Sequence, residues 1–366
     1  MRIGIDARFY GPKKQKGLGR YVKELISGLE KIDNNCEFII FLRKNNWDEY
    51  YPVNNKFKKV LADYKWYGFA EQIFFPFKIW KAKVDLMHFP HFNVPLFCPV
   101  DFVVTIHDLI LKHFPTRKAS TLGPILYFIK NYVYRFVIWI SVKRAKKIIT
   151  VSEYTKKDIL DSFNIEANKV DVIYEGVFTR SLPLDNLGIL RKHKIVKSYL
   201  LYVGNAYPHK NLEKLILAFN GLYGLQLVLV GQIDYFYRRL KKFVYKKNIN
   251  NIIFTDFVSD EDLAILYKNA DLYIFPSLYE GFGLPPLEAM AYGLPVVCSN
   301  SSCLPEILGD AAIYFDPKDI NDIINKIKQV LYSQDMRKKL ISSGYNRIEK
   351  YSWLKMSKKI YDIYIL

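Results

Sequence analysis

Short apolar runs, each followed by a helical pattern, recur along this sequence and constrain its fold more than any other feature. The runs are rich in Val, Ile and Leu and nearly continuous. Such strands alternating with helices are typical of parallel sheets covered on both faces. Two series of them predict two Rossmann-like α/β domains. The predicted strands are residues 2–6, 37–42, 85–89, 102–106, 147–151 and 170–173, then 199–204, 225–231, 252–255, 272–275, 295–298 and 312–315.

The chain has 366 residues, which is too long for one ordinary core and enough for two such domains. Residues 175–183 are loop-like, and a polar stretch follows them. The domain boundary is predicted here, with a first domain at 1–180 and a second at 181–350. Residues 351–366 predict an aromatic helix that crosses back to the first domain. Ligands of open parallel sheets bind beyond the carboxyl ends of the strands. We therefore expect the two sheets to face each other across a cleft that holds the site.

The chain is basic, with a net charge of +18. This excess attracts nucleic acid, anionic lipid or phosphorylated ligands, although a Lys-rich codon usage explains it equally well. We find no sequence pattern of a nucleic-acid-binding module. The four cysteines form no CxxC pair, so a zinc site or disulfide framework is not expected, and a reducing cytoplasm is the predicted compartment.

Residues 122–142 are apolar and aromatic, but Lys130 and Arg135 interrupt them. Each central charge costs about 2.5–3.5 kcal/mol in a spanning helix, so we predict a partly surface-lying helix instead. A basic run at 143–147 follows it. Docking on an anionic membrane surface and an ordinary domain helix both remain open.

Residues 280–288, Glu-Gly-Phe-Gly-Leu-Pro-Pro-Leu-Glu, follow a predicted strand and open a helix. The glycines let a ligand approach the backbone closely, and prolines suit the first turn of a helix. A helix N-terminus offers N–H groups and a positive dipole end to a phosphate. Glu280 and Glu288 can accept hydrogen bonds from sugar and ribose hydroxyls. A merely capped helix would explain Glu288 but not the Gly and Pro pattern.

Three further segments carry candidate residues at the carboxyl ends of predicted strands. Lys210 follows the first strand of the second domain and can neutralise a diphosphate. His107 and Asp108 end a strand of the first domain, where Asp108 can instead cap a turn. Gly17 and Gly19 are predicted to precede a helix at residues 20–31, as a loop that approaches phosphates or as a plain tight turn.

Asp260-Glu-Asp262 spells an Asp-x-Asp metal motif, but Ser259 and the acidic residues after it are typical of a helix N-cap. We interpret the segment as a cap. No other acidic cluster indicates a metal, so we expect neither a metal nor another cofactor.

The 280–288 segment resembles the Glu-x7-Glu motif of retaining family 4 glycosyltransferases, which have the GT-B fold. Residues 270–277, 293–297 and 311–317 resemble the same family, and the likeness covers nearly the whole chain. The family often has Arg where this chain has Asn205 or His209, beside the phosphate-binding Lys that Lys210 matches.

The resemblance implies roles for individual residues. Glu288 should hold the ribose hydroxyls, Glu280 the donor sugar, and Lys210 the diphosphate. His107 should contact the donor sugar, with Asp108 beside it, and Gly17 and Gly19 should approach the phosphates. The remaining expected donor contacts are Asn205, His209, the backbone at Phe282, Gly283 and Leu284, and the backbone around Phe257 and Val258 near the base.

The expected activity is metal-independent hexosyl transfer with retention. The 280–288 and 208–211 segments resemble the mannosyltransferase-like branch, so GDP-mannose is the first expected donor, before a UDP- or dTDP-sugar. The expected acceptor is a growing surface glycan, such as lipopolysaccharide or capsule, or a lipid-linked oligosaccharide at the inner face of the cytoplasmic membrane. The alternatives are another GT-B enzyme, such as a synthase, phosphorylase or epimerase, and a basic binding protein without catalysis.

Overall fold

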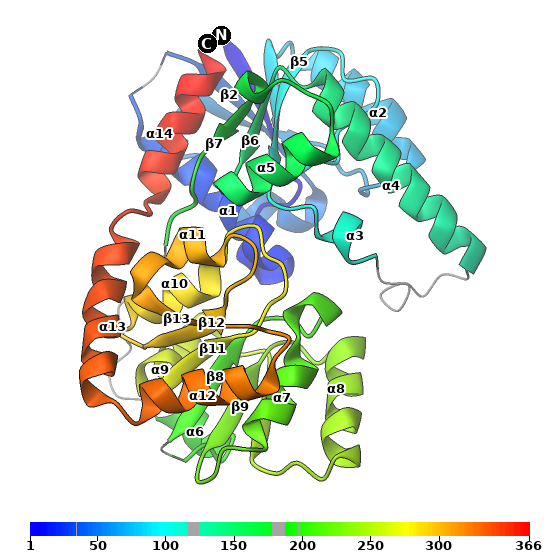
Figure 1. The fold of residues 1–366 in the computed structure, drawn as a ribbon. Helices are drawn as coiled ribbons and strands as arrows, with labels where there is room; N and C mark the ends of the chain where they lie inside the picture. Colours follow the sequence, from blue (N-terminus) through cyan, green and yellow to red (C-terminus); the bar gives the residue numbers. More distant parts are fainter. Residues whose placement is uncertain (34, 116–123, 178–186, 197) are drawn as a thin grey trace. The chain divides into compact units, whose positions relative to one another are not determined.

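The computed structural model describes residues 1–33, 35–115, 124–177, 187–196 and 198–366 (Figure 1). The chain divides into two compact units. Unit 1 comprises Met1–Gly176 and Ser352–Leu366, and unit 2 comprises Val177–Tyr351. Residues 178–186 and 197 of the segment predicted to join the domains (residues 175–198), and residues 122–123 of the predicted apolar helix, lie outside the described residues.

Unit 1 contains a seven-stranded sheet in the order β3-β2-β1-β4-β5-β6-β7, and every pair of neighbouring strands is parallel. Its strands are β1 (Arg2–Asp6), β2 (Glu37–Leu42), β3 (Phe57–Leu61), β4 (Leu86–Phe89), β5 (Asp101–Ile106), β6 (Lys147–Thr150) and β7 (Val170–Val172). The edge strand β3 was not predicted, because Lys58 and Lys59 interrupt its apolar pattern. An edge strand tolerates such charges, since they discourage further pairing.

The helices of unit 1 cover two separate cores on the two faces of this sheet. These elements are α1 (Pro12–Lys31), η1 (Lys44–Glu49), α2 (Phe69–Lys81), α3 (Ile110–His113), α4 (Pro124–Arg144), α5 (Glu153–Ser162), η3 (Ala167–Lys169) and α14 (Trp353–Tyr364). Helices α1 and α14 share one core, and α2, α4 and α5 share the other. A Cβ on Gly28 of α1 would lie 2.1 Å from Ser357 Oγ of α14, so these two helices pack closely.

Helix α1 begins earlier than the sequence predicts. It starts at Pro12, after Gly11 with φ 101°, so the predicted start at Arg20 is wrong. Proline at the first helical position needs no N–H partner, which explains why the helix opens there. Gly17 and Gly19 therefore lie inside the helix rather than in a loop before it.

Unit 2 contains a six-stranded parallel sheet in the order β10-β9-β8-β11-β12-β13. Its strands are β8 (Tyr199–Val203), β9 (Gln226–Val230), β10 (Ile252–Asp256), β11 (Leu272–Phe275), β12 (Val296–Ser299) and β13 (Ala312–Phe315). Its helices are α6 (Gly188–Lys192), η4 (Pro208–Lys210), α7 (Leu212–Phe219), α8 (Tyr235–Lys246), α9 (Asp260–Asn269), α10 (Leu284–Ala291), α11 (Leu304–Leu308), η5 (Gly309–Ala311), α12 (Ile320–Leu331) and α13 (Gln334–Ile348). The prediction of two parallel α/β sheets is confirmed.

The strand order of each unit reverses direction at one point. In unit 2 the chain moves from β8 to one edge and then returns to β11 on the other side of β8. In unit 1 the same reversal separates β1 from β4. Loops that leave such neighbouring strands diverge and open a crevice, which is where open α/β sheets bind ligands.

Candidate active site

Lys210 and Glu280 meet at the point in unit 2 where the strand order reverses. Lys210 ends η4 after β8, and Glu280 follows β11, the neighbouring strand. The ammonium Nζ lies 2.5 Å from Glu280 Oε1, and the two side chains are 12% and 10% exposed. Lys210 Nζ also lies 5.3 Å from the centre of the Phe275 ring. The two residues predicted to hold phosphate and sugar are therefore direct neighbours.

Backbone contacts fix this pair. The N–H of Leu278 donates to the carbonyl of His209 at 2.7 Å and joins the loops after β8 and β11. The N–H of Glu280 donates to Ser302 Oγ at 2.9 Å. Hydrogen bonds to neighbouring loops thus hold the backbone beside Lys210 and at Glu280. A preorganised site requires such support of its side chains.

Gly283 shapes the start of α10. Its φ of 93° lies in the left-handed region, and a Cβ there would approach Leu304 Cδ2 to 2.9 Å. Because Pro285 and Pro286 have no N–H, Leu284 supplies the N–H of the first turn. Gly283 has no side chain to cap this helix, and the N–H groups of a helix N-terminus are suited to an anion. Phe282 is buried and packs edge-on against Tyr351, with ring centres 5.4 Å apart.

Glu288 lies one turn further along α10 and is half-buried. The hydroxyl of the buried Tyr267 donates to Glu288 Oε2 at 3.3 Å. This hydrogen bond orients the Glu288 carboxylate through Oε2. Each carboxylate oxygen can accept more than one hydrogen bond, so the group can also accept from a ligand hydroxyl.

Asn205 and His209 shape the loop after β8. Asn205 Oδ1 accepts the N–H of Tyr207 at 3.2 Å, and its carbonyl accepts the Tyr202 hydroxyl at 2.8 Å. His209 is 5% exposed, and burial, together with the charge of Lys210, lowers its pKa to about 4. His209 is therefore neutral near pH 7 and does not replace the missing Arg as a cation.

Phe257 and Val258 follow β10, at the edge of the unit 2 sheet. Phe257 is 70% exposed, whereas Val258 is buried. Asp256 Oδ1 accepts the N–H of Ile233 at 2.8 Å and ties the loops after β9 and β10 together. An exposed aromatic ring on a fixed loop offers a stacking face to a planar base.

His107 follows β5 in unit 1 and is held at both ring nitrogens. Nδ1 lies 3.0 Å from Glu175 Oε1, and Nε2 lies 3.1 Å from the carbonyl oxygen of Pro90. Both partners accept, so both nitrogens donate when the ring is protonated. Burial lowers the pKa of His107, but the carboxylate of Glu175 outweighs it, and the pKa is raised overall. The rings of Tyr21 and His107 are perpendicular to each other, with centres 4.6 Å apart.

Asp108 has the turn role that the sequence left open. Its Oδ1 accepts the N–H of Ile110 at 2.9 Å, two residues ahead. Such a bond stabilises a turn through an Asp side chain.

A buried histidine lies on β4, the strand beside β5, and sequence reasoning missed it. His88 Nε2 lies 2.8 Å from Thr105 Oγ1, and Nδ1 lies 2.5 Å from the hydroxyl of Tyr364 on α14. Burial lowers the pKa of His88 to about 3, so this ring is neutral. It links the strand that carries His107 to the last helix of the unit.

A buried charged network at the reversal between β1 and β4 was also missed. Arg8 donates to both carboxylate oxygens of Asp6, at 2.8 and 2.7 Å, and contacts Glu71 Oε1 at 2.7 Å. Asn93 Nδ2 donates to the same Glu71 oxygen at 2.7 Å. Among the described residues, Arg8 Nη1 and Asn93 Oδ1 find no hydrogen-bond partner. The Asp-Ala-Arg sequence at the end of the first strand was the available signal.

The predicted helix cap at Asp260 is confirmed, because Ser259 Oγ accepts the N–H of Asp262 at 3.1 Å. Within the part of the chain that the structure describes, no three His, Cys, Asp or Glu side chains gather as metal ligands. The four cysteines form no disulfide and are buried.

The chain matches two family models. Residues 15–180 match "Glycosyltransferase Family 4", and residues 190–347 match "Glycosyl transferases group 1". Together these matches span both units.

Two curated relatives are similar over much of the chain. The O-antigen chain mannosyltransferase B of Escherichia coli is 34% identical, with 58% of each chain covered. The O-antigen chain mannosyltransferase RfbU of Salmonella typhimurium is 30% identical over 74% of this chain and 70% of its own length. The alignment thus spans little more than half of the first relative.

Solved structures share the fold over the whole length. Sucrose-phosphate synthase from Thermosynechococcus elongatus has a TM-score of 0.77 at 20% identity, covering 100% of this chain and 98% of its own. HepE from Anabaena in complex with UDP and glucose has a TM-score of 0.75 at 16% identity, covering 99% of both chains. The chain therefore belongs to family 4 of the glycosyltransferases, retaining enzymes of the GT-B fold.

Proposed function

We propose that this enzyme transfers mannose from GDP-mannose to a growing surface glycan, such as an O-antigen or capsule chain, or to a lipid-linked oligosaccharide. The contact of Lys210 with Glu280 beside the N-terminus of α10 carries the proposal. Similarity to two O-antigen mannosyltransferases supports mannose as the sugar. A UDP-sugar is the next candidate, because HepE, a structural neighbour, binds UDP and glucose.

In this proposal the donor diphosphate lies against Lys210 and the first turn of α10. The bond between the anomeric carbon and the phosphate oxygen breaks through an oxocarbenium-like state, and negative charge grows on that oxygen. The ammonium, the Leu284 N–H and the helix dipole stabilise the charge, as preorganised donors do in an oxyanion hole. No metal is required for this step.

The acceptor hydroxyl attacks the face that the phosphate leaves, so the configuration is retained. Its proton passes to the departing phosphate oxygen, and no enzyme carboxylate forms a covalent bond with the sugar. Glu280 accepts from hydroxyls of the donor sugar, and Glu288, oriented by Tyr267, accepts from the ribose.

Residues of unit 1 are proposed to act on the sugar and the acceptor. Both ring nitrogens of His107 are held by Glu175 and the Pro90 carbonyl, so neither is placed to act as a general base. Its proposed role is to contact the sugar through the carbon edge of the ring. Asp108 holds the turn after it. The proposed place of work is the cytoplasm, at the inner face of the membrane.

A panel of nucleotide sugars, assayed by hydrolysis and by transfer, tests the donor. We expect GDP-mannose to raise the melting temperature and to be consumed. Consumption of a UDP-sugar instead would overturn the mannose assignment and leave the family intact. Activity that EDTA abolishes would overturn the metal-free step.

Replacing Lys210 with Met tests the leaving-group role. Removal of one such preorganised donor costs about 100- to 1000-fold in kcat, and we expect a loss of that order. Lys246→Met, at the end of α8, is the matched control and should keep full activity. Equal rates for the two variants would exclude Lys210 from the transition state.

A further inference from the structure

Helix α2 in unit 1 is apolar on both of its faces. Phe75 and Ile79 face inward and are completely buried. The opposite face exposes large side chains at helical spacing, with Phe77 59% and Trp80 64% exposed. The exposed members are Phe69, Ile73, Phe74, Phe77 and Trp80. A helix that is apolar all round needs a second apolar environment besides its own core.

Helix α4 has a similar outer face over its described side chains. Tyr132, Phe136 and Trp139 follow at spacings of four and three, and all three are exposed. The rings of Phe136 and Trp139 lie parallel, with centres 6.4 Å apart. Lys143 continues the same stripe one turn later and is also exposed. The stripe thus passes from aromatic to basic along the helix.

The loop between β4 and β5 joins the two helices into one surface. The N–H of Leu96 donates to Gln72 Oε1 of α2 at 2.8 Å, and Arg144 at the end of α4 donates to the carbonyl of Leu96. Phe97 is 78% exposed between them. Both helices also pack into the same core, on one side of the sheet (Figure 1). We call these outward residues of α2, the loop and α4 the outer α2–α4 surface.

The charges on this surface have one sign. Neither α2 nor α4 contains an acidic residue apart from Glu71, which is buried. Basic residues lie among and beside the aromatic rings. They are Lys78, Lys81, Arg135, Lys143, Arg144 and Lys146.

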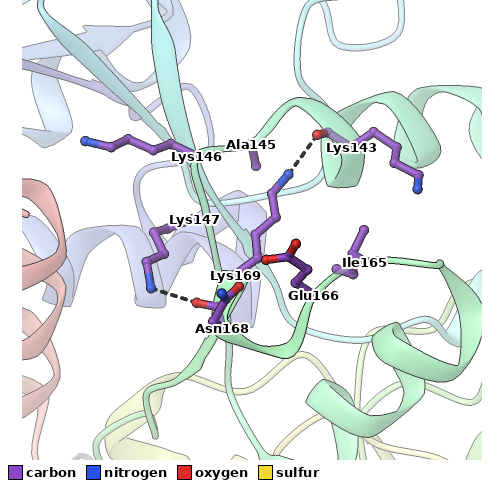
Figure 2. A pocket seen from close by; sticks show the side chains of 8 residues that line it. All are labelled: Lys143, Ala145, Lys146, Lys147, Ile165, Glu166, Asn168 and Lys169. Atoms are coloured by element: carbon purple, nitrogen blue, oxygen red, sulfur yellow. Dashed lines mark hydrogen bonds between the residues drawn. The ribbon is translucent and has the colours of Figure 1, made fainter.

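A basic cavity opens where α4 ends. The cavity has a volume of about 610 Å³ and is lined by lysines from the end of α4, the start of β6 and η3. Figure 2 shows the side chains that line it. Its lining residues are Lys143, Ala145, Lys146, Lys147, Ile165, Glu166, Asn168 and Lys169. Lys169 Nζ donates to the carbonyl of Lys143 at 2.7 Å, and Lys147 Nζ donates to the carbonyl of Asn168 at 2.8 Å. Glu166 is the one acidic residue of this lining, and Lys147 also pairs with Asp171 at 3.0 Å. The lysines still outnumber the carboxylates, so the hollow suits a phosphate group.

The composition favours a lipid surface over a protein partner. Aromatic residues are enriched both at protein interfaces and at membrane interfaces, but Lys is depleted at the former and frequent on surface-lying helices. Among the described residues, no helix is long and apolar enough to span a membrane. The exposed rings therefore fit the headgroup layer of a bilayer.

We propose that the outer α2–α4 surface docks unit 1 on an anionic phospholipid bilayer. The rings of α2, α4 and Phe97 enter the headgroup layer, and the lysine-lined cavity binds lipid phosphates. The sequence pointed only to residues 122–147; the structure adds α2, Phe97 and the cavity. This inference does not depend on the donor, because docking needs no sugar nucleotide.

Flotation of the full chain with vesicles tests it. We expect binding to phosphatidylcholine vesicles that contain about one third phosphatidylglycerol, and far weaker binding to phosphatidylcholine alone. Raising the salt to about 1 M shortens the screening length to about 3 Å and should weaken binding. Equal binding to both vesicle types would overturn the proposal, as would no binding to either.

Two double variants locate the surface. Phe77→Ser with Trp80→Ser, and Phe136→Ser with Trp139→Ser, should each reduce the bound fraction at least about tenfold. The matched control replaces Tyr223 and Tyr245 of unit 2 with Ser, since they are 89% and 86% exposed. All variants should keep the melting temperature and the hydrolysis of the donor, because the replaced rings face outward.

A third variant tests the cavity. Lys143→Gln with Lys146→Gln should lower binding to anionic vesicles and leave the weak binding to neutral vesicles unchanged.

Two results would refute lipid docking. One is that the aromatic variants float like the control. The other is that they change the chain from dimer to monomer in sedimentation, which would assign the surface to a second copy.

Discussion

Lys210 and Glu280 are 70 residues apart in sequence and 2.5 Å apart in space. Both could be selected from the sequence because each belongs to a compact local pattern directly after a strand. Their contact could not be predicted, since it depends on β8 and β11 being neighbours. The same holds for His107, whose partner Glu175 follows it by 68 residues in a segment that carries no motif.

The pH response of His107 follows from this pairing. Its pKa lies above the ordinary value of 6.5 because Glu175 outweighs burial. The pairing therefore stabilises the fold fully below about pH 6.5 and stops doing so as the pH rises through the raised pKa. Glu175→Gln should lower the His107 pKa, measured by NMR of the ring. Glu166→Gln, on a distant exposed carboxylate, should leave it unchanged.

A second residue-scale prediction concerns Glu71. Its side chain is completely buried and accepts from Arg8, from Asn93 and from the N–H of Tyr67, so Glu71→Ala would leave these donors without their acceptor. Loss of one partner of a buried ion pair costs about 3–5 kcal/mol, measured as the free energy of unfolding of unit 1. Glu213→Ala removes an exposed partner of Arg239 and should cost less than about 1 kcal/mol. Similar losses for both would contradict the role of this network.

At the scale of elements, the sequence predicted what depends on local patterns and missed what depends on surroundings. The cap at Ser259 and the helix after Gly283 are local and were predicted. The strand at Phe57–Leu61 was missed because its lysines are tolerated only at a sheet edge. The outer face of α2 was not singled out either, because Phe and Trp residues in a sequence do not reveal whether they face a core or solvent.

The prediction at the scale of elements concerns Gly283. Gly283→Ala must place a Cβ in the left-handed region, at roughly 1–2 kcal/mol, and also 2.9 Å from Leu304. We expect a lower melting temperature and weaker binding of the donor nucleotide. Gly224→Ala is the control for backbone strain alone, because φ is 73° there and no atom lies within 4 Å. If both variants bind the nucleotide like the unmodified protein, donor binding does not depend on the left-handed conformation of Gly283 at the start of α10.

At the scale of the molecule, helix α14 belongs to the unit that begins the chain. Ile360 is completely buried in the core that α14 shares with α1, so Ile360→Ala should cost about 2–5 kcal/mol. Hydrogen exchange should rise in α1 and α14 and stay unchanged in the strands of unit 2. Ile365→Ala, at a 55% exposed position, should have no such effect. Faster exchange in unit 2 would show that the units do not unfold separately.

The shared core of α1 and α14 also determines the order of events on the ribosome. Residues 352–366 are made only after the whole of Val177–Tyr351, a delay of roughly 10–35 s at about 5–20 residues per second. Throughout that time the nascent α1 lacks its covering helix, although all the strands of its sheet have already emerged. Unit 1, synthesised first, is thus the unit that finishes folding last, and its uncovered apolar face is where a chaperone would bind the growing chain.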